Sequence, residues 1–134
     1  MTRAARYAYF VLAWAFLVGV VVQVFFIGLA LFGQESTDIH KNLGWILHLV
    51  PILILLAAAL SRAGRRHWQW AMALAVVVFV VPILATMRDT PVIAALHPVG
   101  ALASFALAIV VARNSLDAVR QTDAGDAPSG AAAA

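Results

Sequence analysis

The sequence from Tyr7 to Phe32 reads YAYFVLAWAFLVGVVVQVFFIGLALF and contains no charged residue. Because an α-helix rises about 1.5 Å per residue, about 20 apolar residues cross the hydrocarbon core of a bilayer, and this stretch is longer than that. Lipid offers backbone amides no hydrogen-bond partner, so an apolar run of this length is expected to be a helix. It also exceeds the roughly 7–15 apolar residues of a signal peptide, and no clean cleavage site follows it. We therefore predict a retained transmembrane helix over residues 7–32.

Three further apolar segments predict helices at about residues 40–61, 67–87 and 91–112. The connections between them are short, so neighbouring helices should run antiparallel. The predicted fold is an all-α membrane protein, an up-down-up-down four-transmembrane-helix bundle formed by residues 1–113. Residues 114–134 are rich in Ala, Asp, Gly, Pro and Ser, a composition that predicts a disordered tail.

The composition narrows the classes of function. Hydrophobic residues make up 64% of the chain and charged residues 11%, against roughly 45–50% and 25% in soluble domains, so we expect the lipid bilayer as a partner. The absence of cysteine excludes disulfides, thiolate chemistry and iron–sulfur ligation. No basic run with interleaved aromatic residues points to nucleic acid. The predicted helices contain no nucleophile–base pair and no intramembrane acid, so we expect no catalytic residues and no ion-driven transport.

The basic residues predict the orientation. When the chain is threaded four times through a membrane, one side collects Arg3, Arg6, Arg62, Arg65, Arg66, Arg113 and Arg120. Lys41 and Arg88 fall on the other side, beside acidic residues. The positive-inside rule therefore predicts that both termini, including the tail, are cytoplasmic.

Three polar residues stand out within the apolar segments: Gln23, His48 and His97. Polar groups are costly inside a bilayer, and each therefore needs a structural or functional reason. Counting helical rises places His48 about 8–12 Å and His97 about 8–10 Å below the outer ends of their helices, and Gln23 about 13 Å below its own. The three side chains are thus predicted to share one layer of the outer leaflet.

The second and fourth predicted helices run in the same direction and should occupy diagonal corners of the bundle. His48 and His97 would then face each other across the core, as two axial ligands of one b-type haem do. Gly44 and Gly100 lie one helical turn from these histidines and would leave a slot for a porphyrin. One haem near the outer face cannot carry electrons across the membrane, so this hypothesis describes a redox subunit or electron carrier with a partner protein.

Further polar residues complete this candidate site. Lys41 and Arg88, near the outer surface, are candidates to pair with haem propionates. Gln23 is a candidate hydrogen-bond donor to the ligand or to an imidazole.

Alternatives remain open for the same residues. Membrane histidines also bond to backbone carbonyls, and Pro51 and Pro98 leave the carbonyls of Leu47 and Ala94 without their helical partners. The chain would then be a non-catalytic accessory or structural subunit of a membrane complex with no cofactor. A proton or small-ligand site at these residues is a third hypothesis.

Two more histidines lie near the predicted membrane surfaces. His40 is expected at the outer interface, with an outer metal site shared with His48 as a minor option. His67 is expected on the inner surface, beside two arginines.

Two segments carry a resemblance to known sequences. They are His40-Lys-Asn-Leu-Gly-Trp-Ile-Leu-His48 and Leu96-His-Pro-Val-Gly100, together with Gln23 shortly before two phenylalanines. With these features, about residues 7–112 resemble an uncharacterised family of small bacterial four-helix integral membrane proteins. The resemblance implies the four-helix architecture and a multi-pass protein of the bacterial inner membrane, and it implies no activity.

Overall fold

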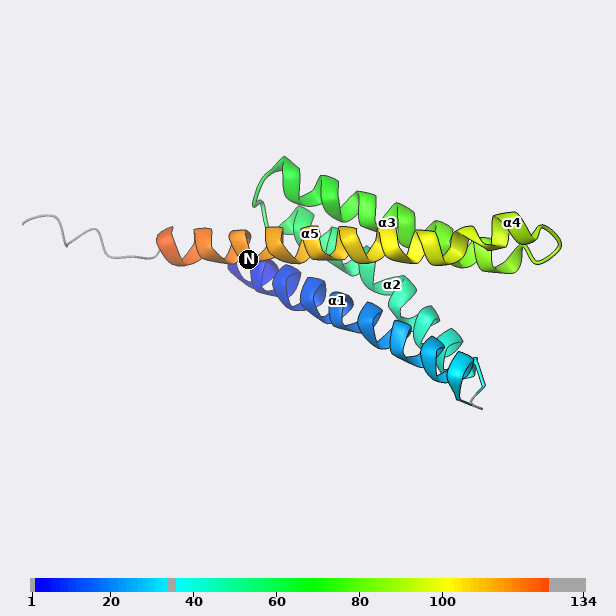
Figure 1. Cartoon of the computed structure of the whole chain (residues 1–134). Coiled ribbons are helices and arrows are strands. Elements are labelled where there is room, and N and C mark those ends of the chain that lie inside the picture. Colours follow the sequence, from blue (N-terminus) through cyan, green and yellow to red (C-terminus); the bar gives the residue numbers. More distant parts are fainter. Residues whose placement is uncertain (1, 34–35, 126–134) are drawn as a thin grey trace, which may run out of the picture.

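The computed structural model describes residues 2–33 and 36–125. Its helices are α1 (Thr2–Phe32), α2 (Asp38–Leu60), α3 (Arg65–Thr86), α4 (Pro91–Ala94) and α5 (Leu96–Gly125). Figure 1 shows the long helices α1, α2, α3 and α5 side by side, each running antiparallel to the one before it in the chain. Four spans in the described residues, the last combining α4 and α5, are long and apolar enough to cross a membrane. The predicted four-helix membrane fold is confirmed.

The last predicted helix is interrupted near its start. The short helix α4 begins at Pro91 and ends at Ala94, and α5 begins at Leu96. Pro98 lacks an amide hydrogen, and its ring clashes with the carbonyl of Ala94 in a straight helix. The chain therefore breaks between the two residues, and the amide of Ala95 bonds back to the Pro91 carbonyl at 2.9 Å.

The helix α5 continues to Gly125, so the prediction of a disordered tail from residue 114 is wrong over residues 114–125. Ser115 and Ala118 are fully buried in this extension. The Ser115 hydroxyl also donates to the carbonyl of Ala112 at 2.7 Å. Composition alone did not reveal this packing. The rest of the predicted tail, residues 126–134, lies outside the described residues.

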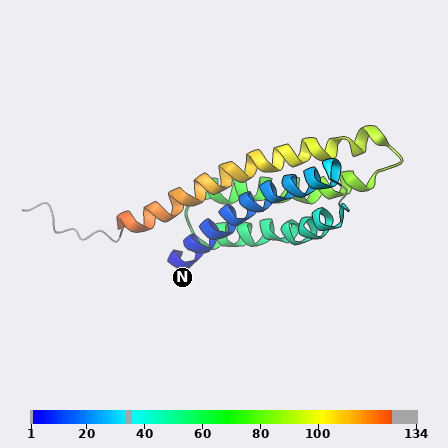
Figure 2. The same ribbon diagram turned by 60° about the horizontal axis from the view of Figure 1, so that its bottom comes forward.

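The helices pack as two hairpins, α1–α2 and α3–α5. The helix α1 packs against α2 and α5, while α3 packs against α2 and α5. The helices α2 and α5 therefore occupy diagonal corners of the bundle, as the sequence predicts (Figures 1 and 2).

The N-terminus, the α2–α3 turn and the C-terminal half of α5 meet at one end of the bundle, which we call the basic end (Figure 2). Arg6 Nε donates to the carbonyl of Ser61 there, at 3.2 Å. Apart from the turn that carries Arg88, the arginine-bearing segments are thus gathered at one end. That this end faces the cytoplasm stays a prediction.

The core is concentrated toward the basic end. Its largest fully buried side chains include Tyr9, Phe16, Ile54, Leu74 and Val111, contributed by all four long helices. The Tyr9 hydroxyl donates to the Val111 carbonyl at 3.4 Å. At the opposite end, which we call the open end, the two hairpins diverge (Figure 1). The separation of the hairpins positions the candidate site.

Candidate ligand-binding cavity

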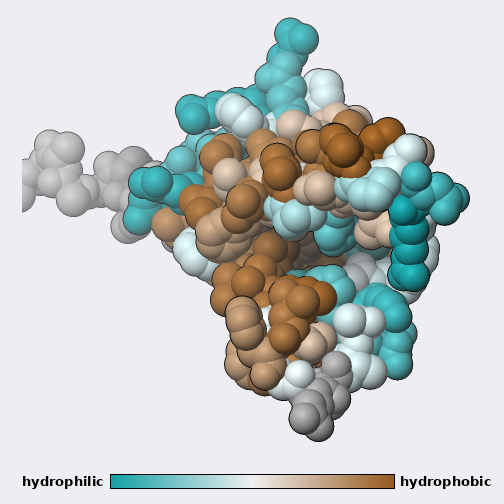
Figure 3. All heavy atoms as spheres, turned by 45° about the vertical axis from the view of Figure 1, so that its right-hand side comes forward, coloured by the Kyte–Doolittle hydropathy of each residue, from teal (hydrophilic) through white to brown (hydrophobic). Residues whose placement is uncertain are grey.

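A cavity of about 470 Å³ lies between the hairpins toward the open end. Its volume falls within the roughly 300–1,000 Å³ typical of small-molecule sites. All four long helices contribute to its predominantly apolar wall. Figure 3 shows a hollow between the two hairpins, with both hydrophobic and hydrophilic residues around its opening. The structure thus offers a ligand-sized space among the spanning helices.

The cavity brings together most of the residues singled out in the sequence. Its wall includes Gln23, Lys41, Gly44, His48, Arg88 and His97. Gly100 is not part of the wall, whereas His40, Trp45 and Ser104 are. The depth argument from helical rise therefore identified residues that line one cavity.

His97 is half-buried, and its imidazole is oriented by α3. Its Nδ1 lies 2.9 Å from the carbonyl oxygen of Val81. Because a carbonyl only accepts, Nδ1 carries the hydrogen, and Nε2 of the neutral ring keeps a lone pair. Metal-binding histidines commonly have this arrangement, in which a backbone carbonyl fixes the other nitrogen. The carbonyl is that of Val81 on α3, rather than the Ala94 carbonyl considered from the sequence.

His40 has an equivalent bond in the other hairpin. Its Nδ1 lies 3.2 Å from the carbonyl oxygen of Gln23 on α1, so its Nε2 also keeps a lone pair. The ring is half-buried and lines the cavity, whereas the sequence predicted a solvated interfacial histidine. Sequence reasoning missed this role because it depends on how α1 and α2 are rotated toward each other.

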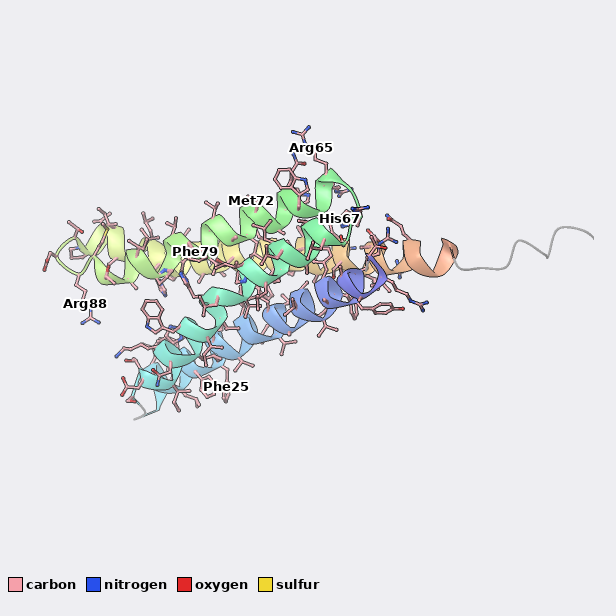
Figure 4. The ribbon with its side chains drawn as sticks, turned by 180° about the vertical axis from the view of Figure 1, so that it is seen from behind. Phe25, Arg65, His67, Met72, Phe79 and Arg88 are labelled. Carbon is pink, nitrogen blue, oxygen red and sulfur yellow. The ribbon has the colours of Figure 1, made fainter. Side chains whose placement is uncertain are left out.

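The His48 imidazole packs among aromatic rings. Its centroid lies 4.1 Å from that of Phe79 on α3 and 5.9 Å from that of Trp45 on α2. Figure 4 labels Phe79 in the space where α3 passes α2. No hydrogen bond joins this imidazole to another residue in the described part of the chain. Ring packing therefore holds His48, while both of its nitrogens stay available.

The two glycines of the candidate site allow close helix contacts. A Cβ added at Gly44 would lie 2.8 Å from Nε2 of Gln23, and one added at Gly100 would lie 2.7 Å from Cγ2 of Val81. The neighbouring side chains thus occupy the space that the sequence hypothesis assigned to a porphyrin slot. The Gln23 Oε1 atom is buried and has no hydrogen-bond partner among the described residues.

Two basic residues lie at the rim. Lys41 is exposed and pairs with Asp38 at 3.2 Å. Arg88 follows α3 and forms no ion pair with a described acidic residue. Figure 4 shows Arg88 projecting from the turn at the open end. The rim therefore combines a guanidinium that has no acidic partner among the described residues with an ammonium in an exposed, weak ion pair.

Within residues 2–33 and 36–125, no group of three or more His, Cys, Asp or Glu side chains is placed to hold a metal ion. The cavity histidines therefore do not form a multi-ligand protein site such as tetrahedral zinc. Two imidazoles that line one cavity could bind a metal whose other ligands come from a cofactor.

At the basic end, the prediction that His67 lies on the surface is wrong. Its side chain is 7% exposed, and its ring meets that of Tyr9 edge-on, with centroids 6.1 Å apart. Its Nδ1 is buried without a hydrogen-bond partner in the described chain. The adjacent arginines favoured a surface position, and the burial became visible only in the structure, where His67 on α3 meets Tyr9 on the diagonal helix α1.

Comparison with known proteins identifies one similar family and suggests no activity. No curated protein matches the chain, and no solved structure does. Residues 23–87 match a family of unknown function, DUF6220. The match includes Gln23, His40 and His48 and excludes the segment around His97, which the sequence resemblance had included. The expected resemblance to an uncharacterised family is confirmed, and over residues 23–87 the chain is similar to the Family of unknown function (DUF6220).

Proposed function

We propose that this multi-pass membrane protein binds one b-type haem in the open-end cavity, with His48 and His97 as axial ligands. In this proposal it resides in a bacterial inner membrane with both termini in the cytoplasm, and it acts near the outer face as a redox subunit or electron carrier. One observation carries the proposal: histidines from the diagonal helices α2 and α5 line the same cavity.

The histidine environments support ligation. The Val81 carbonyl fixes the His97 tautomer that leaves Nε2 available, and this is the form that binds iron. His48 has no competing hydrogen bond from a described residue, and Phe79 and Trp45 restrict its ring. The group, when bound, would supply one-electron transfer, while the apolar wall would limit access of water.

The rim supports a ligand with acidic groups. Arg88 has no described acidic partner, and Lys41 is held only by an exposed ion pair with Asp38. A carboxylate at this rim would gain a charge-assisted hydrogen bond from the guanidinium. Haem combines such carboxylates with a flat apolar body, which matches the apolar wall below the rim.

A second candidate function is supported by the glycine contacts. Gln23 packs over Gly44, and Val81 packs over Gly100, as expected where glycines allow two helices to approach closely. In this alternative, the protein is an accessory subunit of a membrane complex without a cofactor. Both proposals include a partner protein. In the accessory alternative it is the rest of the membrane complex. In the haem proposal it is a second electron carrier, because an outer-face haem alone cannot move electrons across the membrane.

An absorption spectrum distinguishes the two. The protein would be expressed with added haem precursor, purified in mild detergent and compared with His48→Ala and His97→Ala. A Soret band that is lost in both variants supports haem ligation, with His40→Ala as the matched control because His40 lines the same cavity. A colourless protein would overturn haem binding, and a band lost only in His40→Ala would overturn the assigned ligands.

A further inference from the structure

Trp45 belongs to the cavity wall and to the outer surface of the protein at the same time. It lines the cavity, yet 68% of the residue is exposed. It lies seven residues after the start of α2 at Asp38, or about 10 Å along the helix axis. Because α2 is a membrane-spanning helix, this exposed surface faces acyl chains.

Phe79 stands opposite on α3 at a matching depth. It lies seven residues before the end of α3 at Thr86, again about 10 Å along the axis. It is 38% exposed, and its ring contacts that of His48. His48 itself lines the cavity. Between α2 and α3, the rings of Trp45, His48 and Phe79 therefore separate the cavity from lipid.

This aromatic boundary is held by ring packing. No hydrogen bond or ion pair from a described residue fixes any of the three rings. Partly exposed side chains change rotamer on the picosecond-to-nanosecond scale, far faster than ligand exchange. The nearby Pro82 also lines the cavity, and without an amide hydrogen it leaves the carbonyl of Val78 without a helical partner, so α3 can bend there.

We propose that the cavity has a side opening to the bilayer between α2 and α3, with Phe79 as its gate. Acyl chains of the surrounding leaflet reach the cavity when the Phe79 ring turns aside, and the apolar body of the ligand enters by this route. The rim beside Arg88 keeps the acidic groups of that ligand at the membrane surface. Only the identity of the ligand rests on the proposed haem function, because the opening itself follows from the position of the rings.

Site-directed spin labelling tests the opening in the full chain. Ala101 lines the cavity from α5, and the chain has no native cysteine, so Ala101→Cys gives a single labelling site. In liposomes, molecular oxygen concentrates in the acyl chains, whereas a nickel chelate stays in water. We expect oxygen to relax the label more than the chelate does. Phe79→Ala should raise oxygen accessibility by about twofold or more, because it removes the ring without replacing its volume.

The neighbouring residue provides the control. Leu102 is 70% exposed on the lipid face of α5, so a label at Leu102→Cys should be equally accessible to oxygen with either residue at position 79. Phe79→Leu, a smaller truncation, serves if Phe79→Ala fails to fold. Dominant relaxation of the Ala101→Cys label by the nickel chelate, unchanged by either Phe79 variant, would overturn the opening.

The measurement requires no bound haem, so the two proposals fail separately. If the protein is colourless but Phe79 controls the oxygen accessibility of the label, the side opening is supported and haem binding is overturned. If the protein shows a Soret band but the oxygen accessibility does not respond to Phe79, haem binding is supported and the side opening is overturned.

Discussion

Nδ1 of His97 donates its hydrogen to the carbonyl of Val81 at 2.9 Å, and this bond joins α5 to α3 at the cavity wall. The same contact fixes the imidazole tautomer that presents Nε2 as a lone-pair donor. The Val81 carbonyl thus stabilises the α3–α5 hairpin and also fixes the tautomer in which His97 can bind a metal.

The His97 contact should contribute to stability without any ligand. We expect His97→Ala to lower the free energy of unfolding by about 1–3 kcal/mol, because a partly buried hydrogen bond and its packing are lost. Titration with SDS in mixed micelles, followed by circular dichroism, measures this change. Leu102→Ala is the exposed control on the same helix. Equal losses in the two variants would show that the bond adds nothing.

Haem should stabilise the protein if it binds the native cavity. A ligand at 100 times its dissociation constant raises the free energy of unfolding by about 2.7 kcal/mol through mass action. We expect added haem to raise the thermal midpoint of the wild-type protein and to leave that of His48→Ala unchanged. Fluorescence-detected unfolding measures both. A similar rise in the two proteins would indicate nonspecific haem binding.

Gly100 should tolerate no side chain. A Cβ there would lie 2.7 Å from Cγ2 of Val81, a stiff β-branched side chain that cannot move aside easily. We expect Gly100→Ala to cost about 1–3 kcal/mol. Gly28→Ala is the matched control, because a Cβ at Gly28 meets nothing within 4 Å. That control should instead stabilise α1 by up to about 1 kcal/mol. SDS titration of both variants checks the contrast, which a neutral Gly100→Ala would contradict.

The backbone of the α2–α3 turn is strained at Arg62, and a substitution there can relieve the strain. Arg62 has φ +50°, a left-handed conformation that costs a side-chain-bearing residue roughly 1–2 kcal/mol. We expect Arg62→Gly to stabilise the protein by about 0.5–1 kcal/mol, because glycine adopts this conformation readily and loses part of the gain to chain entropy. Arg62→Ala removes the same charge and keeps the strain, so it should show no gain. An equal effect of both variants in SDS titration would trace the change to charge.

The orientation is open to a direct test. The concentration of arginines at the basic end predicts a cytoplasmic C-terminus. A reporter enzyme that is active only in the cytoplasm, fused after Ala134, should therefore be active. An active fusion of an exclusively periplasmic reporter would reverse the predicted topology.

The sequence by itself determined the number of spanning helices. Lipid leaves the backbone of a long apolar run no alternative to internal hydrogen bonds, and this constraint is local. Helical rise is also local, so counting residues predicted similar depths for His48 and His97. Alternating direction then followed from short connections, and both histidines line one cavity in the structure.

Only the tertiary structure decided what each polar side chain meets. The contact of His40 with Gln23, the burial of His67 beside Tyr9 and the packing of Val81 over Gly100 depend on rotations of helices about their axes. Those rotations come from packing between segments far apart in the chain, which also buries Ser115, Ala118 and Val119 in the extension of α5. Residue spacing fixes depth and face within one helix, whereas the angle between the hairpins, and hence the cavity, is set by the fit of all four helices at the basic end.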